Sequence, residues 1–286
     1  MQIAFFGLGN MGSPIAANLI KSGYNVTITV HHNPAPAERL IKLGAHLAET
    51  PALAVADADV IFTIVPNDTA LLNLLTPELL KVVKPGATII EMTSASGDAV
   101  CQVAKRCRKY GLNLLDAPVS GGVSGATKGT MSILCAGDKA ILEKVRPLLD
   151  CISGKVCYLG EQIGQAKIVK SLNNLLSAIN KTAVTEAYKI AMKKKVSPQV
   201  FYDAISVSSG NSAAFGAVVP RLRAKDFSTG FSVALMRKDL ELALALKPAD
   251  LNLPLSETVL EYYKQAAPFD QEDSSAVAKV NFNKTK

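Results

Sequence analysis

The chain lacks the residue clusters that bind structural metals or form disulfide frameworks. Its five cysteines are scattered without a CxxC pair, and its three histidines, His31, His32 and His46, lie far from them in the sequence. These spacings argue against a zinc site and against a disulfide-stapled fold, so we predict that no metal is bound. Scattered thiols in odd number are typical of a reducing compartment, and we therefore expect a cytoplasmic protein.

Long apolar runs and long runs of one charge are also missing. No apolar stretch approaches the roughly 18 residues that a membrane-spanning helix requires. The net charge of +7 is spread along the chain, and the single basic run, at 193–195, is typical of a solvated helix end. We therefore expect neither a membrane nor a nucleic acid among the partners.

What the sequence does contain is a regular alternation of short apolar runs and helical stretches. The chain has 286 residues, 49% hydrophobic and 19% charged, which is enough for one large domain or two ordinary ones. Strand-like runs occur at 3–6, 25–30, 59–65, 87–91, 112–116, 130–135 and 155–159. Because helical stretches separate these runs, the first half predicts a mostly parallel, doubly wound sheet of the α/β class.

The second half has a different pattern. From about residue 164 onward the strand signals stop, and helical periods occupy 166–194, 199–207 and 232–247. The first of these would be a helix of nearly 30 residues, about 40 Å long. We therefore predict an all-α C-terminal domain that this long helix joins to the sheet.

A glycine pattern follows the first strand and opens the first helical stretch. It consists of Gly7, Leu8, Gly9, Asn10, Met11 and Gly12. In this context the first glycine permits a tight turn, the second admits the pyrophosphate, and the third lets the helix pack on the strand. The pattern predicts a Rossmann-type dinucleotide-binding domain at 1–162, followed by the helical domain at 163–286. A purely structural glycine turn is the alternative.

The end of the second strand bears on the choice of cofactor. NAD sites usually carry an Asp or Glu there, which binds the ribose 2′-hydroxyl. This chain instead has His31, His32 and Asn33. Two imidazoles that can carry positive charge would tolerate a 2′-phosphate, so we predict NADP or NAD, with a preference for NADP. The alternative is that both histidines are merely exposed loop residues.

Two further segments carry polar groups that suit a carboxylate-bearing substrate. Ser120, Gly121 and Gly122 follow a strand, where a hydroxyl and open backbone N–H groups can bind an anion. Lys170 and Asn174 are spaced i, i+4 and so share one face of the long helix. Taken alone, the first segment is equally typical of a plain turn, and the lysine of a side chain that extends to solvent.

Together these segments resemble a known family. The segments 7–12, 116–122, 170–174 and 238–239 follow one another as in the β-hydroxyacid dehydrogenases, which include 3-hydroxyisobutyrate dehydrogenase, tartronate semialdehyde reductase and L-threonate dehydrogenase. The resemblance covers essentially the whole chain. It implies a Rossmann domain, an all-α domain that dimerises, and an active site between the two.

The resemblance also implies a role for each matching residue. Lys170 would be the general acid/base, and Asn174 its hydrogen-bonding partner that also touches the substrate. Ser120, Gly121 and Gly122 would bind the substrate carboxylate. The remaining matches lie near the cofactor: Thr93 and Ser94 beside the nicotinamide, Val65 and Pro66 on the adenosine side, and Lys238 over both cofactor and substrate. Asp239 is expected to order the helix on which it lies.

These assignments predict an NAD(P)-dependent oxidoreductase. It would interconvert a small 3-hydroxy acid, such as threonate, 3-hydroxyisobutyrate or a glycerate-like acid, and its oxo or semialdehyde form, as a homodimer or homotetramer. The alternatives are an imine or aldehyde reductase of the same superfamily and a non-enzymatic cofactor-binding module. Lys170 argues against an imine reductase and against a non-enzymatic module, because the relatives of those kinds generally lack the lysine.

Overall fold

The computed structural model describes residues 1–31, 33–228 and 230–280. The chain forms two compact units, Met1–Lys170 and Ser171–Lys286. His32, one of the residues predicted to bind the cofactor, lies outside the described residues. The predicted domain boundary between residues 162 and 163 stays a prediction.

A parallel sheet forms the centre of the first unit. Its strands are β1 (Gln2–Phe6), β2 (Asn25–Ile28), β3 (His46–Leu47), β4 (Val60–Thr63), β5 (Thr88–Glu91) and β6 (Asn113–Asp116), in the spatial order β3-β2-β1-β4-β5-β6. The chain reverses its direction of progress between β1 and β4, which creates the switch point where dinucleotides bind in such sheets. The predicted doubly wound fold is confirmed, and within this sheet only the two-residue strand β3 was not foreseen.

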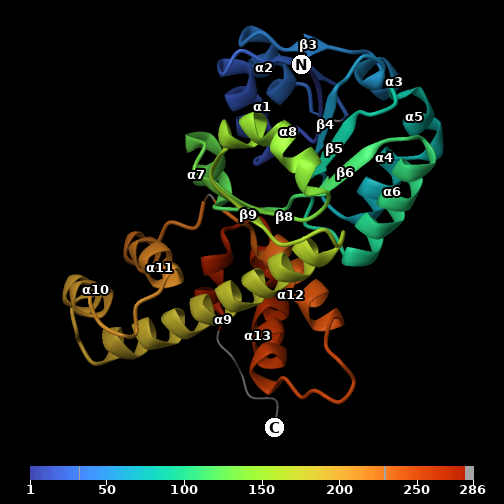
Figure 1. Cartoon of the computed structure of the whole chain (residues 1–286). Helices are drawn as coiled ribbons and strands as arrows, with labels where there is room; N and C mark the ends of the chain where they lie inside the picture. The colour runs from blue at the N-terminus through green and yellow to red at the C-terminus, as the bar shows by residue number, and fades with distance from the viewer. Residues whose placement is uncertain (32, 229, 281–286) are drawn as a thin grey trace. The chain divides into compact units, whose positions relative to one another are not determined.

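Helices cover both faces of this sheet. They are α1 (Gly12–Lys21), α2 (Ala35–Lys42), α3 (Pro51–Val55), α4 (Asp68–Leu74), α5 (Pro77–Val82), α6 (Gly97–Lys109), α7 (Gly122–Lys128) and α8 (Lys139–Asp150). Alternate residues of β1 point to opposite faces: Ile3 and Phe5 pack with α1, α2 and α8, whereas Ala4 and Phe6 pack with α3 to α6 (Figure 1). Because both faces are buried, the strand sequences are almost continuously apolar.

A second, smaller sheet corrects one expectation. The runs predicted as strands at 130–135 and 155–159 form β8 (Met131–Cys135) and β9 (Ser153–Tyr158), but they do not extend the parallel sheet. They pair with an unforeseen strand, β7 (Val119–Ser120), which runs antiparallel to β8. Only two residues connect β6 to β7, and a parallel crossover needs a dozen or more. The link is therefore too short for β7 to join the parallel sheet as a parallel neighbour of β6, and β7 pairs with β8.

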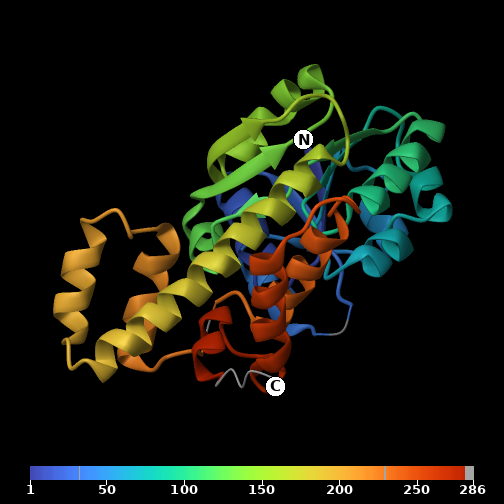
Figure 2. The ribbon, with the colours of Figure 1, turned by 90° about the horizontal axis from the view of Figure 1, so that it is seen from below.

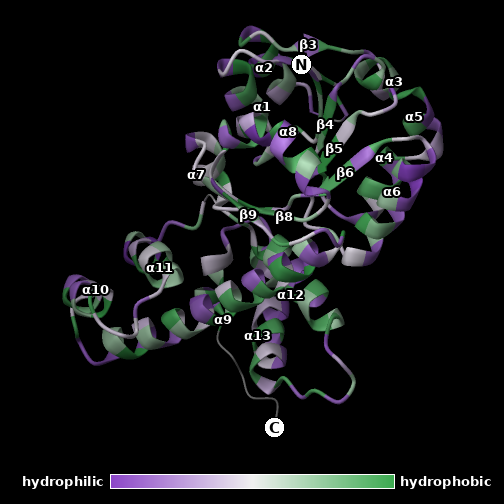
Figure 3. Ribbon diagram, in the orientation of Figure 1, coloured by the Kyte–Doolittle hydropathy of each residue, from purple (hydrophilic) through white to green (hydrophobic). Residues whose placement is uncertain are grey.

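The second unit is all-helical, as predicted. It contains the larger part of α9 (Gln165–Lys193), followed by α10 (Pro198–Ser206), α11 (Ala213–Ala224), α12 (Val233–Ala245), α13 (Pro254–Gln265) and the short 3₁₀ helices η1 (Ala267–Phe269) and η2 (Ser274–Lys279). Ala178 packs in one apolar cluster with α12 and α13, and Val184 in another with α11. Helices α10 and α11 lie at the C-terminal end of α9 (Figure 2). Hydrophobic and hydrophilic residues mix along every helix of this unit (Figure 3).

The longest helix, α9, has 29 residues and spans about 43 Å at 1.5 Å per residue. That length would suffice to cross a bilayer, but lysines interrupt its apolar stretches. Throughout the part of the chain that the structure describes, no helix combines the length and the apolar character of a membrane span.

Candidate active site

The loop between β1 and α1 contains the three glycines predicted to bind the pyrophosphate. Gly7 has a φ of +98°, and a Cβ atom there would lie 2.0 Å from the carbonyl oxygen of Ile64. A Cβ on Gly12 would lie 1.8 Å from the carbonyl oxygen of Gly7. A Cβ on Gly9, in contrast, would meet no heavy atom within 4 Å. The fold itself therefore requires Gly7 and Gly12, whereas Gly9 borders open space that a ligand can enter.

The N-terminus of α1 is suited to an anion. Its first turn contains no acidic residue, and no side chain caps it at Met11. On the opposite face of the sheet, the Ser96 hydroxyl caps α6 by accepting from the Ala99 backbone N–H at 3.1 Å. An uncapped helix start presents backbone N–H groups and the positive end of the helix dipole. These features of the loop and of α1 fit the diphosphate of NAD or NADP.

The residues predicted around the two ends of the cofactor differ in exposure. His31 is exposed beyond the end of β2, and the Asn33 side chain accepts from the Ala35 backbone N–H at 3.1 Å, where α2 begins. Thr93 is fully buried, and its hydroxyl accepts from the Val65 backbone N–H at 3.1 Å. Thr93 thus ties the loop after β5 to the loop after β4.

On these two loops, Ser94 is half-buried, whereas Pro66 is exposed.

The predicted carboxylate-binding segment begins in β7. Ser120 is half-buried and lies opposite Ser132 of β8. Gly121 and Gly122 then adopt φ values of +134° and +61°, a region that favours glycine, and α7 starts without a side-chain cap. A Cβ on Gly122 would meet no heavy atom within 4 Å. A hydroxyl, a tight glycine turn and open space at Gly122 therefore occur together.

Lys170 and Asn174 lie one turn apart on α9, and both are nearly buried, with exposed fractions of 8% and 6%. The amide group of Asn174 is held in place, because its Nδ2 donates to Asp239 Oδ2 at 2.5 Å and its Oδ1 accepts from Asn173 at 3.0 Å. Lys238 Nζ lies 3.2 Å from the other carboxylate oxygen of Asp239. Asp239 was expected to order its own helix; its carboxylate also accepts from Asn174 of α9 and lies beside Lys238 of α12.

Three buried charges that the sequence analysis did not single out meet in the first unit. Lys167 Nζ lies 2.5 Å from Glu91 Oε2 and 3.1 Å from Asp116 Oδ1, and all three side chains are at most 1% exposed. Burial alone lowers the pKa of the Lys167 ammonium, but the two carboxylates outweigh it, so its pKa is raised. The sequence carried one signal: a lysine at a position of α9 flanked by the apolar residues Ala166 and Ile168.

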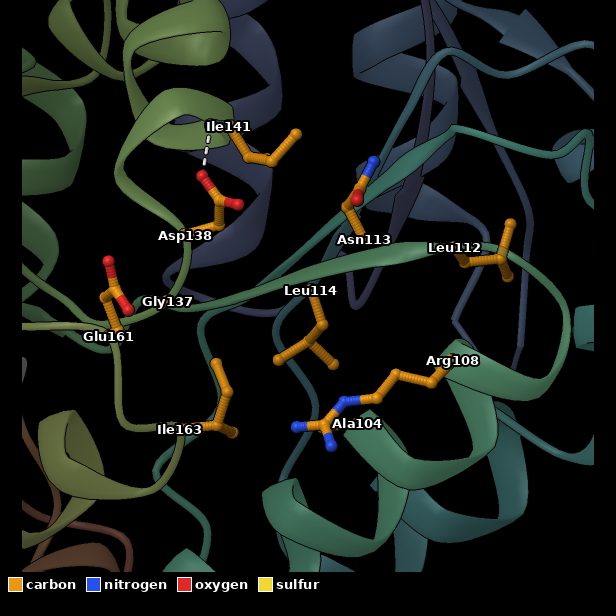
Figure 4. A pocket seen from close by; sticks show the side chains of 10 residues that line it. All are labelled: Ala104, Arg108, Leu112, Asn113, Leu114, Gly137, Asp138, Ile141, Glu161 and Ile163. Carbon is orange, nitrogen blue, oxygen red and sulfur yellow. Dashed lines mark hydrogen bonds between the residues drawn. The ribbon is translucent and has the colours of Figure 1, made fainter.

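A hollow of about 260 Å³ opens beside β6 (Figure 4). It is lined by Ala104, Arg108, Leu112, Asn113, Leu114, Gly137, Asp138, Ile141, Glu161 and Ile163, none of which was predicted for the site. Its Asp138 carboxylate caps α8 by accepting from the Ala140 and Ile141 backbone N–H groups.

The residues that the structure describes include no cluster of three or more His, Cys, Asp or Glu side chains suited to a metal ion.

Comparison with known protein families matches nearly the whole chain. Residues 2–160 match the NAD binding domain of 6-phosphogluconate dehydrogenase. Residues 164–281 match the family described as NAD-binding of NADP-dependent 3-hydroxyisobutyrate dehydrogenase.

Individual relatives agree with these matches. The 2-(hydroxymethyl)glutarate dehydrogenase of Eubacterium barkeri is 34% identical, over 98% of this chain and 94% of the relative. The structure of Mycobacterium tuberculosis 3-hydroxyisobutyrate dehydrogenase with L-serine is 33% identical and superposes with a TM-score of 0.88, covering 98% of this chain and 99% of that one. An imine reductase from Myxococcus stipitatus, at 23% identity over 98% and 99% of the two chains and a TM-score of 0.63, is alike in fold alone.

Proposed function

Because the chain belongs to the β-hydroxyacid dehydrogenase family and is an NAD(P)-dependent dehydrogenase, we propose that Lys170 is the general acid/base of its reaction. The substrate pair is a small 3-hydroxy acid and its oxo or semialdehyde form. One observation carries the proposal: the nearly buried Lys170 lies one turn from Asn174, whose amide Asp239 holds. An ammonium group is costly to remove from water, so a lysine in such surroundings is more typical of a functional group than of a surface residue.

The chemistry requires one proton transfer at the substrate oxygen. When bound, the nicotinamide supplies the hydride acceptor for oxidation and the hydride donor for reduction. Lys170 Nζ takes the hydroxyl proton during oxidation and returns it to the carbonyl oxygen during reduction. Asn174 touches the same substrate oxygen, and Asp239 keeps its amide in one orientation. A positioned acid/base of this kind contributes about 10²- to 10⁴-fold to the rate.

Ser120, Gly121 and Gly122 are proposed to bind the substrate carboxylate. The two relatives named for hydroxy acids act on 2-(hydroxymethyl)glutarate and 3-hydroxyisobutyrate. Both molecules, and the L-serine in the second structure's title, contain a CH₂OH group on the carbon that bears the carboxylate. We therefore propose this HOCH₂–CH(X)–COO⁻ unit as the shared part of the substrate, with the group X setting the choice among acids.

For the cofactor, the first glycine loop and the start of α1 would bind the diphosphate, with Val65 and Pro66 on the adenosine side. Thr93, Ser94 and Lys238 are assigned to the nicotinamide side. The preference for NADP is supported by His31, an exposed imidazole that stands where an NAD site usually carries a carboxylate.

The acid/base assignment is tested with Lys170→Ala and a panel of 3-hydroxyisobutyrate, L-serine, L-threonate, glycerate and 3-hydroxypropionate. We expect kcat to fall by about 10²-fold or more on the best acid of the panel, because the proton transfer loses its catalyst. The reduced cofactor should still bind, as measured by its fluorescence. Lys181→Met, on the same helix, serves as the control and should leave kcat unchanged. Near-normal turnover of Lys170→Ala would refute the assignment.

The cofactor assignment is tested with Gly9→Ala, matched with Gly216→Ala on α11, where a Cβ would likewise meet no heavy atom within 4 Å and φ is not positive either. Gly9→Ala should weaken NADPH binding at least about tenfold, since the new methyl group enters the space for the pyrophosphate. Gly216→Ala should not. His31→Asp should shift the ratio of kcat/KM values towards NAD, and a tenfold preference of the unaltered enzyme for NAD would contradict the NADP proposal.

We also propose that the enzyme is a cytoplasmic homodimer or homotetramer. Leu176 and Ile190 on α9 and Val200 on α10 are each about 60% exposed, and they would be buried by a second copy. The five free cysteines suit a reducing compartment. Light scattering coupled to size-exclusion chromatography measures the assembly, and a monomer at micromolar concentration would contradict it.

A further inference from the structure

The buried charges of Lys167, Glu91 and Asp116, here called the charge triad, connect three segments of the first unit. Glu91 is the last residue of β5 and lies two residues before Thr93. Asp116 is the last residue of β6, in the segment that leads to Ser120. Lys167 lies in the first turn of α9, three residues before Lys170. Each member is therefore a near neighbour in sequence of a residue assigned above to the substrate or the nicotinamide.

Further hydrogen bonds tie the triad to the backbone around it. Besides its two carboxylate partners, Lys167 Nζ donates to the backbone oxygen of Glu91 at 3.2 Å. The other carboxylate oxygen of Glu91 accepts from the Thr93 backbone N–H at 2.8 Å, and that of Asp116 accepts from the Gly164 backbone N–H at 2.9 Å. The ammonium group thus has three oxygens for its three N–H donors, and each carboxylate also fixes one backbone segment.

Stability alone does not account for this arrangement. Removing charges from water is costly, and well-packed apolar residues of similar volume are often as stabilising as a buried ion pair. What the charges add is geometry, because each partner is held at a set distance and direction. In this triad, the geometry fixes where α9 begins relative to the carboxyl ends of β5 and β6.

We propose that Lys167, Glu91 and Asp116 are positioning residues, which set the place of the Lys170 amine relative to the Thr93 and Ser120 loops. The inference rests on the proposed role of Lys170. A displacement of about 1 Å at a reacting group can lower the rate about 10²-fold. Because the triad holds α9 one turn before Lys170, its loss should have a measurable effect on kcat. Because the three side chains are at most 1% exposed, we assign them no contact with the reacting atoms.

The main test variant is the pair Lys167→Gln with Glu91→Gln. One positive and two negative charges give the triad a formal charge of −1, and the pair leaves only Asp116, again −1. The substitution removes the ion pair without leaving an additional buried charge, so the enzyme should fold. We expect kcat to fall about 10- to 100-fold, with the NADPH dissociation constant changed less than about threefold. Lys181→Met, the matched control on the same helix, should leave kcat unchanged.

A cycle with Lys170→Ala separates positioning from a structural role. If the triad acts through Lys170, adding the Gln pair to Lys170→Ala lowers kcat by less than about twofold, because the group being positioned is already gone. An equal loss in both backgrounds would overturn the inference, and so would an unchanged kcat of the Gln pair. Near-normal turnover of Lys170→Ala would instead remove the proposed function on which the inference rests.

Discussion

The charge triad of the first unit and the core of the second unit hold buried lysines in opposite ways. Lys167 and Lys181 lie on one helix, 14 residues apart, and both amines are largely buried. Lys167 faces two carboxylates, which raise the pKa of its amine despite burial. Lys181 donates to the Ser274 hydroxyl at 2.6 Å. Burial lowers its pKa, and Arg221 lowers it further, while Asp273 opposes them only in part.

The comparison shows that the partners of a buried amine, and not burial alone, set the direction in which its pKa shifts. Next to the predicted site, charged partners keep the Lys167 amine protonated and fix its direction. In the second unit, the largely buried Lys181 amine donates to a hydroxyl, and the exposed residue Lys189 donates to the Val280 backbone oxygen at 2.9 Å. The first arrangement specifies one geometry, whereas the second tolerates change.

The largest expected difference between the two regions is in stability. Lys167→Met leaves two carboxylates facing each other out of water, and we expect it to lower the free energy of unfolding by roughly 3–5 kcal/mol. Lys181→Met removes one hydrogen bond to a hydroxyl and should cost only about 1 kcal/mol. Urea unfolding followed by circular dichroism measures both, since the chain has no tryptophan to report by fluorescence. If both variants lost the same free energy of unfolding, the charged partners of Lys167 would make it no more important for stability than Lys181 is.

Much of the fold could be predicted because it depends on local patterns. The apolar runs gave the strands of the parallel sheet, and the Gly7 to Gly12 pattern between strand and helix predicted the nucleotide-binding topology. The partition into two sheets could not be predicted, because hydrophobic alternation does not say which sheet a strand joins. The two-residue connection after Asp116 excludes a parallel crossover, but it does not determine that β7, β8 and β9 pair with one another.

For the candidate site, sequence reasoning identified residue types but not their partners. Lys170 and Asn174 were found from their spacing and from the family resemblance. The contact between Asn174 and Asp239 joins residues 65 positions apart, and the one between Lys167 and Glu91 spans 76. Such pairs depend on tertiary packing, so a single sequence offers no periodic signal for them.

The pH dependence of stability should differ in sign between the two lysines. The folded-state pKa of Lys181 lies below its ordinary value of 10.5, so between these two values the unfolded chain binds more protons, and stability rises with pH. The folded-state pKa of Lys167 lies above 10.5, so its contribution is complete below that pH and is lost as the pH rises through the folded value.

Urea unfolding at several alkaline pH values measures each contribution. The free energy of unfolding of the unaltered protein is compared with that of Lys181→Met and with that of the Gln pair at Lys167 and Glu91. The advantage of the unaltered protein over Lys181→Met should grow as the pH approaches 10.5. Its advantage over the Gln pair should stay constant up to that value and shrink above it. If the two stability differences changed with pH in the same direction, the contrast between Lys167 and Lys181 would be wrong.

The smallest expected effect is local, and two buried thiols report it. Burial raises the pKa of both Cys107 and Cys135 to about 12, with Asp116 adding to the effect at Cys135. Cys135 lies next to Ala136, which exchanges two backbone hydrogen bonds with Asp116, whereas Cys107 packs on the opposite face of the sheet. Both thiols should react slowly with iodoacetamide under native conditions.

In the Gln pair at Lys167 and Glu91, we expect the alkylation rate of Cys135 to rise several-fold while that of Cys107 stays as in the unaltered protein. The reason is that the Asp116 carboxylate loses its ammonium partner and keeps the bond from the Gly164 backbone N–H, so local opening of the neighbouring backbone becomes easier, without making global unfolding easier to the same degree. Mass spectrometry of the two cysteine peptides measures both rates in one sample. If the alkylation rates of both thiols rise by the same factor, the opening is global. The triad then stabilises the whole first unit rather than the segments around Lys170.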